Sequence, residues 1–335
     1  MRILLTGGSG SVGGELVKRL TGAGHEIRVL GRRPGASLEG AEYVRCDVTD
    51  AAGLRDAMRG CEAVLHLAAL PSPFHGPGEE VFRINCDGSF KVYQVAAELG
   101  IRRVVSASSI NAVGYNFGIK RFPIRYLPID EEHPGFTTDS YSFSKQVLEE
   151  IAAYFWRREG ISGCTLRLPW VVNPTVDMLS RLRSDQERAE PLIREWIALP
   201  PREGEARAEE VIAWKERARA ERREQYGAEA RPPEKRPFAS VSGAYTNFFT
   251  VIDARDSAQA FEKALFAEYE GSHPLFVNDS VNRYGVSSRE LARLFFPEAA
   301  VRPTLEGSAS LVSIDRARRL IGFEPEYSVP RMLER

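Results

Sequence analysis

Cysteine is scarce in this sequence, and its placement suggests neither a metal site nor a disulfide framework. The 335 residues include four cysteines, and no two of them stand in a CxxC pair. A zinc site or a disulfide framework normally shows such regular cysteine spacing. We therefore expect no metal site and reduced thiols at Cys46, Cys61, Cys86 and Cys164.

The sequence also lacks an excess of either charge and any long apolar run. Its 45 Lys and Arg residues nearly balance 46 Asp and Glu residues, for a net charge of −1. This balance argues against nucleic acid or an anionic membrane as a partner. No apolar run approaches the roughly 20 residues that span a bilayer, and the first residues already have a strand pattern, without a signal peptide. We expect a cytoplasmic protein with small-molecule ligands.

The first feature that is present is a glycine-rich turn near the amino terminus. Residues 2–6 contain the apolar run of a short buried strand, and glycines follow at Gly7, Gly10 and Gly13. Apolar residues at helical spacing come next. In this setting the backbone N–H groups bind a pyrophosphate, because glycine leaves room for its approach. The turn predicts a dinucleotide site, with an ordinary glycine-rich turn as the alternative.

Strand and helix patterns alternate after this turn. Strands are predicted over 25–30, 42–45, 63–69 and 103–107, and helices over 51–59 and 79–99. Gly100 is predicted to stop the long helix. Such alternation predicts an α/β fold, a Rossmann-type doubly wound parallel sheet, with ligands at the carboxyl ends of its strands.

The end of the second predicted strand bears on the choice between NAD and NADP. An acid about 20 residues beyond the glycines would bind the ribose of NAD, but this region contains Arg32 and Arg33 and no acid. Two guanidinium groups suit the 2′-phosphate of NADP; a solvated basic loop is the alternative. Asp47 is expected to bind the adenine amine or to cap the next helix. We expect NADP or NAD, with NADP favoured.

A tyrosine and a lysine four residues apart provide the candidate catalytic pair. Tyr141 and Lys145 share one face of a predicted helix, about one turn apart. Tyrosine has a pKa of about 10 and is a poor base at neutral pH. We expect the lysine ammonium and the positive charge of an oxidised nicotinamide to lower that pKa. Tyr141 would then accept the proton of a substrate hydroxyl while hydride leaves the same carbon.

These segments together resemble the extended short-chain dehydrogenases/reductases, the superfamily that includes the NAD-dependent epimerases and dehydratases. The resemblance covers about the first 170 residues. It lies in TGGSGSVG at 6–13, CDV at 46–48, HLAA at 66–69, Asn85 with Gly88, SASS at 106–109 and the Tyr141/Lys145 pair, with weaker matches at 253–258 and 317–325.

The resemblance implies a role for each matching position. Tyr141 would be the acid/base, Lys145 would hold the nicotinamide ribose, and Ser109 or its neighbour Ser108 would bind the reacting oxygen. Asn85 would line the cofactor site or serve as a buried structural amide. The implied cofactor site comprises Gly7, Gly10, Ser11, Val12, Gly13, Arg32, Arg33, Asp47, Val48, Leu67, Ala68, Ala69, Asn85, Ala107, Tyr141, Lys145 and Leu168. The implied substrate site comprises Ser72, Ser109, Ile110, Asn111, Tyr141 and Trp170.

The sequence departs from the pattern of members that act on nucleotide sugars. Those members carry R-x-x-N-x-x-G-P after the sixth strand, whereas residues 167–174 place Trp170 at the Asn and Asn173 at the Gly. Phe249 stands where an arginine commonly binds phosphate. Loss of two such contacts would cost roughly 1.5–3 kcal/mol each. The run at 106–115 is instead similar to dehydrogenases of free sugars or uronic acids.

The remaining half is predicted to form a smaller, mixed substrate-binding region. We place the dinucleotide-binding domain at residues 1–172 and this region at 173–335, with 247–270 returning to the first domain. A charged stretch at about 176–236 includes a predicted helix at 206–226. A solvated helix, a lid and a subunit contact are all compatible with its near-equal numbers of Arg and Glu.

The leading hypothesis is an NAD(P)-dependent oxidoreductase of carbohydrate metabolism that acts on a carbinol or carbonyl carbon of a sugar-like or uronic-acid-like substrate. The alternatives are an epimerase or dehydratase that retains NAD, and a non-catalytic dinucleotide-binding sensor. A homodimer is an expectation from the resemblance alone.

Overall fold

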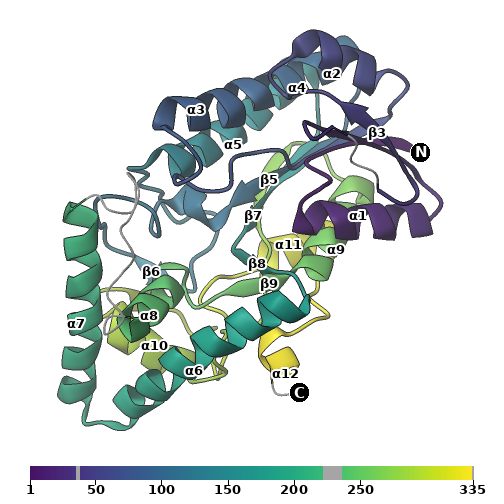
Figure 1. Ribbon diagram of the computed structural model, residues 1–335. Helices are drawn as coiled ribbons and strands as arrows, with labels where there is room; N and C mark the ends of the chain where they lie inside the picture. Colours follow the sequence, from purple (N-terminus) through teal and green to yellow (C-terminus); the bar gives the residue numbers. More distant parts are fainter. Residues whose placement is uncertain (35–37, 222–235, 334–335) are drawn as a thin grey trace.

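Seven parallel strands form the main sheet of the computed structural model, which describes residues 1–34, 38–221 and 236–333 (Figure 1). The spatial order is β10-β7-β5-β4-β1-β2-β3. The predicted doubly wound α/β fold is thus confirmed. The strands are β1 (Arg2–Thr6), β2 (Glu26–Gly31), β3 (Ala41–Arg45), β4 (Ala63–His66), β5 (Val104–Ser109), β7 (Gly163–Leu168) and β10 (Ser272–Phe276).

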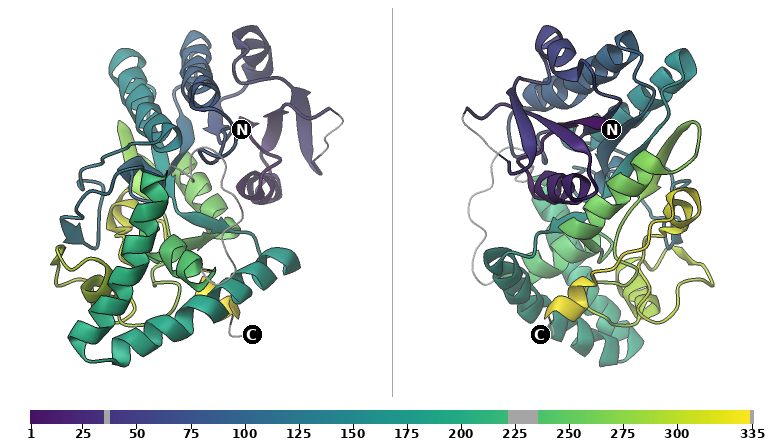
Figure 2. Two further views of the ribbon diagram at one scale, coloured as in Figure 1. Left: turned by 60° about the vertical axis from the view of Figure 1, so that its left-hand side comes forward. Right: turned by 90° about the vertical axis from the view of Figure 1, so that its right-hand side faces the viewer.

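Helices cover both faces of this sheet (Figure 2). Apolar side chains of α2, α4 and α5 pack with one set of strand residues, and those of α1, α9 and α11 pack with the other set. The helices are α1 (Ser11–Gly22), α2 (Ala51–Met58), α4 (Gly88–Glu98), α5 (Ser140–Glu159), α9 (Ala254–Phe266) and α11 (Asp315–Ile321). Strand order reverses between β1 and β4, the switch point at which such folds bind ligands.

One predicted strand is shorter than expected, and one predicted helix is confirmed over residues 78–98 with a π-helical turn inside it. The strand predicted over 63–69 ends at His66, because the N–H groups of Leu67 and Ala68 donate to Thr6 Oγ1 as the chain leaves the sheet. The helix predicted over 79–99 is divided into α3 (Gly78–Phe82), a π-helical turn (Arg83–Asp87) and α4. Gly100 follows with φ of 73°, consistent with the predicted stop.

A second group of elements lies beyond the carboxyl ends of the main strands. Aromatic side chains form much of its core, including Tyr115, Tyr245, Phe248, Phe295 and Phe296. Its elements are β6 (Tyr126–Leu127), β8 (Trp170–Val172), α6 (Val176–Ala198), α7 (Pro201–Ala220), α8 (Arg236–Thr246), β9 (Val251–Asp253), α10 (Ser288–Phe295), β11 (Ala300–Val301) and α12 (Val329–Leu333).

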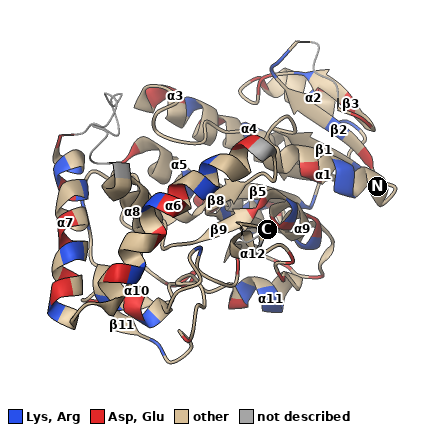
Figure 3. Ribbon diagram, turned by 60° about the horizontal axis from the view of Figure 1, so that its bottom comes forward, with Lys and Arg blue, Asp and Glu red and all other residues tan. Residues whose placement is uncertain are grey.

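The charged stretch forms the two long helices α6 and α7. Helix α7 begins at Pro201, before the predicted 206, and ends at Ala220; residues 222–226 of the prediction lie outside the described residues. Ala208 and Val211 of α7 are buried, and charged residues of both signs occur along the length of this helix (Figure 3). Within the parts of the chain that the structure describes, no helix has the length and apolar character needed to cross a bilayer.

Candidate active site

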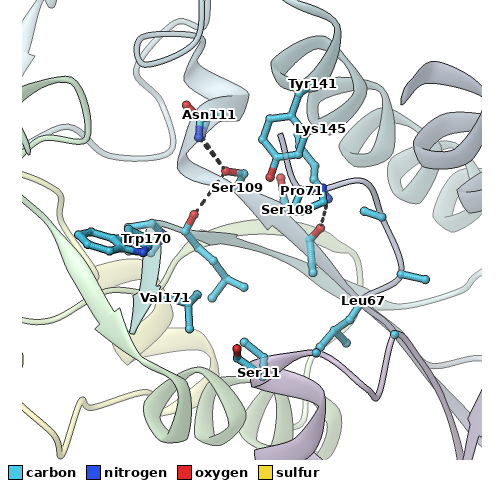
Figure 4. Close-up of a pocket in the computed structure, with 18 of the residues that line it drawn as sticks. Ser11, Leu67, Pro71, Ser108, Ser109, Asn111, Tyr141, Lys145, Trp170 and Val171 are labelled. Atoms are coloured by element: carbon cyan, nitrogen blue, oxygen red, sulfur yellow. Dashed lines mark hydrogen bonds between the residues drawn. The ribbon is translucent and has the colours of Figure 1, made fainter. Parts of the chain in front are cut away.

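A cavity of about 1010 Å³ lies at the carboxyl ends of the main strands and is also lined by residues of the second group of elements. It brings together most of the residues selected from the sequence. Those lining it are Gly7, Gly10, Ser11, Val12, Gly13, Arg32, Arg33, Asp47, Val48, Leu67, Ala68, Ala69, Ala107, Ser109, Asn111, Tyr141, Lys145, Leu168 and Trp170. Figure 4 shows Tyr141 and Lys145 extending from α5 toward Ser109, with Ser11 of α1 on the opposite side.

The glycine turn has the geometry that a pyrophosphate requires. Gly7 has φ of 75°, and a Cβ placed there would lie 2.8 Å from the Ala68 nitrogen. A Cβ at Gly13 would lie 2.5 Å from Gly8 Cα. The N-cap Gly10 supplies no side chain to the first turn of α1, so backbone N–H groups at this helix start remain available for an anion. These residues fit a dinucleotide.

Asp47 lies in the cavity wall and does not cap α2. It accepts hydrogen bonds from Thr49 N at 2.9 Å and from Thr49 Oγ1 at 2.8 Å. The helix is capped instead by Asp50, which accepts from Ala52 N and Gly53 N. Burial raises the pKa of Asp47, but the Thr49 hydrogen bonds and the Arg32 charge outweigh it and hold the pKa below its usual value. Asp47 is therefore a carboxylate 4.0 Å from Arg32.

Three residues selected from the sequence do not line the cavity. Asn85 bonds the Leu70 backbone, donating to Leu70 O at 3.1 Å and accepting from Leu70 N at 2.8 Å. Asn85 therefore has the contacts of a buried structural amide, which is the alternative role that the sequence left open for it. Ser72 bonds His75 Nδ1 at 2.7 Å, and Ile110 is buried in an apolar cluster.

The Ser109 hydroxyl lies on the same side of the cavity as the Tyr141 hydroxyl and lowers the pKa of Tyr141. Ser109 ends β5, and its Oγ accepts from Asn111 N at 3.1 Å and Asn111 Nδ2 at 3.2 Å. Asp139 fixes the start of α5 by accepting from Ser142 N at 2.8 Å. The end of one strand and the first turn of one helix therefore set the geometry of this pair.

Ser108 has a different partner. Its Oγ donates to Glu149 Oε1 at 2.6 Å, and Glu149 also forms a bidentate ion pair with Arg167 at 2.9 and 2.8 Å. Both ionic side chains are nearly buried. Of the two serines left open by the sequence, Ser109 is the one whose hydroxyl affects the pKa of Tyr141, whereas the Ser108 hydroxyl is directed to Glu149.

The protein alone raises the pKa of Tyr141, whereas we expected Lys145 and an oxidised nicotinamide to lower it. Burial raises this pKa to about 12, although the nearby Ser109 hydroxyl opposes the shift. Burial also lowers the pKa of Lys145 to about 8. The Lys145 ammonium donates to Ala107 O at 2.8 Å and lies 5.6 Å from the centre of the Tyr141 ring. In the protein without oxidised nicotinamide, Tyr141 is therefore protonated and can act as a proton donor.

Sequence reasoning missed one wall of the cavity. That wall includes amide and hydroxyl side chains together with charged groups of α6, α7 and the segment after β10. No local motif marks these positions, since helices and loops far apart in the chain bring them together. They are Asn116, Phe117, Asp185, Lys215, Ser240, Ser242, Asn247 and Arg283.

The two neighbouring serines provide a matched pair of variants. We expect Ser109→Ala to lower kcat by roughly 10- to 100-fold, since one hydrogen bond to the reacting oxygen would be lost. Ser108→Ala should leave kcat within about threefold and instead lower the free energy of unfolding by about 1 kcal/mol, because it removes a bond to Glu149. Steady-state kinetics and chemical denaturation test both variants. Equal kcat values for the two variants would contradict the assignment.

The sequence matches the model of the NAD dependent epimerase/dehydratase family over residues 3–197. It is 32% identical over 177 residues to NAD-dependent glucose-6-phosphate dehydrogenase of Haloferax volcanii, covering 50% of this chain and 67% of that protein. It is 31% identical over 169 residues to uronate dehydrogenase of Pseudomonas putida, covering 50% of this chain and 60% of that protein. Each alignment thus leaves a substantial part of the relative unmatched.

The fold is also found in solved structures. A short-chain dehydrogenase/reductase superfamily protein from Agrobacterium tumefaciens, with bound NAD, superposes with a TM-score of 0.65. The superposition covers 100% of this chain and 95% of that chain, at 24% sequence identity. This likeness shows a shared architecture.

Proposed function

Because the chain belongs to the NAD-dependent epimerase/dehydratase family of enzymes, we propose that it is an NAD(P)-dependent dehydrogenase of a sugar or uronic acid. The observation that carries this proposal is that Tyr141, Ser109 and Lys145 line one cavity together with the glycine turn, which lies across from them. The test is whether reduced cofactor accumulates when a sugar is supplied.

In the oxidative direction, each of the three residues has its own role. A bound oxidised nicotinamide would supply the acceptor for the hydride that leaves the carbinol carbon. Ser109 holds the substrate oxygen, and Tyr141 Oη accepts its proton, so that a carbonyl product remains. Lys145 would bind the nicotinamide ribose, and its positive charge would favour the tyrosinate. The raised pKa of Tyr141 keeps its hydroxyl protonated in the protein alone, which is the state needed for the reverse step, proton donation to a carbonyl.

The lining of the cavity supports a polyhydroxylated substrate. Asn111 and Asn247 each have a buried side-chain oxygen without a hydrogen-bond partner in the described structure. Ser240 and Ser242 of α8 lie in the same wall. Buried acceptors without partners are costly, and hydroxyl groups of a substrate would satisfy them. Sugars supply such groups, and the two relatives above are dehydrogenases of a sugar phosphate and a uronate by name.

We also propose a preference for NADP over NAD. Arg32 and Arg33 follow β2 and line the cavity, and residues 30–34 contain no acid. The double variant Arg32→Ala/Arg33→Ala should weaken NADP binding by roughly 10- to 100-fold and leave NAD binding within about threefold, because the 2′-phosphate loses its charged donors. Arg45→Ala, which removes a nearby exposed arginine, is the control. Calorimetric titration that shows equal losses for both cofactors would refute the preference.

A homodimer is proposed on the evidence of an exposed aromatic surface. Phe82, Phe90, Phe143 and Tyr154 are 37–47% exposed on neighbouring segments of α3, α4 and α5. Phe82 stacks on Phe143, and Phe90 stacks on Tyr154. Apolar surface of this kind favours association. Light scattering should give twice the 37.4 kDa chain mass, and a monomer would refute the proposal.

A further inference from the structure

Glu149 lies one helical turn beyond Lys145 on α5, and the chemistry described so far gives it no role. Its side chain is only 12% exposed. Its Oε1 accepts from Ser108 Oγ at 2.6 Å and from Arg167 Nε at 2.9 Å, and its Oε2 accepts from Arg167 Nη2 at 2.8 Å. A carboxylate is retained at such a depth only where partners stabilise its charge.

Two consecutive residues at the end of β5 are each bonded to α5. Lys145 Nζ donates to Ala107 O at 2.8 Å, and the Ser108 hydroxyl donates to Glu149 (Figure 4). Ser108 is paired in register with Arg167 of β7. Neighbouring residues of two strands therefore hold the Glu149 carboxylate one helical turn from the lysine.

The Lys145 amine is 4% exposed, so its positive charge requires compensation. Burial lowers the pKa of Lys145 to about 8, and Cys86 and Glu149 oppose that shift. Cys86 supplies no negative charge near neutral pH, because burial raises the pKa of its thiol to about 12. Glu149 is ion-paired with Arg167 and thus ionised. The carboxylate of Glu149 is therefore the anion that stabilises the ammonium.

The neighbouring imidazole and phenol carry no charge at neutral pH. Burial lowers the pKa of His66 on β4 to about 3, and the Lys145 charge adds to that shift. Burial raises the pKa of Tyr141 to about 12. Asp139, the N-cap of α5, acts on Tyr141, whose pKa it raises further. Among the described residues, Glu149 is thus the one ionised side chain that raises the pKa of Lys145.

We propose that Glu149 is a positioning residue that keeps Lys145 in its ammonium form for the Tyr141 chemistry. Arg167 and Ser108 fix the carboxylate for this purpose. The inference rests on the proposed function and adds a residue to it. Without the carboxylate, Lys145 would lose its proton at a lower pH, and the neutral amine would no longer favour the tyrosinate. Loss of the Ser108 hydroxyl alone leaves the carboxylate and its ion pair in place, which agrees with the small effect on kcat expected for Ser108→Ala.

An NMR titration of protein labelled with ¹³C at lysine Cε follows the protonation of Lys145 without substrate or cofactor. The Lys145 signal is identified by its absence from Lys145→Arg. In wild type it should titrate at about pH 8. In Glu149→Gln it should titrate at a pH lower by roughly 1 or more, the usual effect of losing a nearby opposite charge. Glu150→Gln, which changes the adjacent exposed glutamate, should match wild type. An unchanged Lys145 titration in Glu149→Gln would overturn the proposal.

A second variant covers the case in which Glu149→Gln does not fold. That substitution leaves the Arg167 guanidinium buried without its carboxylate, which is strongly destabilising. Glu149→Gln/Arg167→Met removes both members of the ion pair. Lys145 should still titrate below wild type in this variant, because the carboxylate lies one turn away on the lysine's own helix, whereas Arg167 is on β7. A wild-type titration would show that Glu149 serves only as the structural partner of Arg167 and would overturn the proposal.

Turnover separates this inference from the proposed function. Because the rate should follow the ammonium fraction of Lys145, kcat of Glu149→Gln should lie within about twofold of wild type at pH 6 and at least about fivefold below it at pH 8. An equal loss at both pH values would indicate a purely structural role and overturn the proposal. A shifted Lys145 titration in a protein that reduces no cofactor with any sugar would refute the dehydrogenase proposal and keep the coupling of Glu149 to Lys145. Turnover with an unshifted titration would do the reverse.

Discussion

Tyr141→Phe should lower kcat by roughly 100- to 10,000-fold, the contribution of a positioned general acid or base. The ring should stay in place, since Phe117 packs against it edge to face at 5.8 Å and α5 is capped independently by Asp139. Cofactor affinity should therefore remain within about threefold of wild type. Kinetics and cofactor titration on the same preparation measure both quantities.

The pH dependence supplies a second readout for Tyr141. Burial holds its pKa at about 12 in the protein alone, so the proton-accepting tyrosinate is a small fraction at neutral pH. Since that fraction grows with pH, the oxidation rate of wild type should rise with pH, and Tyr141→Phe should lose this rise. Tyr93→Phe is the control, since it removes another buried hydroxyl, one bonded to Ser106 at 3.0 Å. Substantial residual turnover in Tyr141→Phe, with the pH dependence intact, would refute the assigned role.

Gly13→Ala should affect both folding and cofactor binding. The added Cβ would lie 2.5 Å from Gly8 Cα and 2.7 Å from Gly7 O, and backbone cannot swing aside as a flexible side chain can. Overpacking of this kind costs roughly 1–3 kcal/mol of unfolding free energy. The displaced turn also carries the N–H groups that face the pyrophosphate. We expect cofactor affinity to fall by at least about 100-fold, the equivalent of two ordinary hydrogen bonds.

The adjacent glycine is the control for Gly13. A Cβ at Gly14 meets nothing within 4 Å. Gly14→Ala should therefore bind cofactor like wild type and raise the free energy of unfolding by about 0.5–1 kcal/mol, because alanine loses less entropy in a helix. Thermal denaturation and cofactor titration compare the two. Wild-type affinity in Gly13→Ala would refute this description of the turn.

The features that sequence predicted best are those fixed by local chemistry. Strand β1, the glycine turn and α1 are predicted by a short apolar run, three glycines and apolar residues at helical spacing, all within one short segment. The Tyr141/Lys145 pair is equally local, since one turn of helix places both side chains on the same face. The order of strands and helices up to Ser109 follows from apolar periodicity in the same way.

The features that sequence missed depend on distant contacts. The different surroundings of Ser108 and Ser109 depend on Glu149 and Arg167, which lie on other elements and bond with Ser108 or with one another. Lys215 is directed by the bonds of Arg219 to a loop about a hundred residues earlier in the chain. The raised pKa of Tyr141 reflects burial, which no spacing of residues reveals.

The most direct test of the central claim counts reduced nicotinamide formed per protein molecule. The protein is incubated with excess oxidised cofactor and, in turn, with D-glucuronate, D-glucose 6-phosphate and D-glucose. A dehydrogenase should form many equivalents of reduced cofactor with at least one sugar, and Tyr141→Phe should form essentially none. No more than one equivalent, together with NAD retained through purification and an isomerised or dehydrated sugar, would contradict the claim and indicate an epimerase or dehydratase.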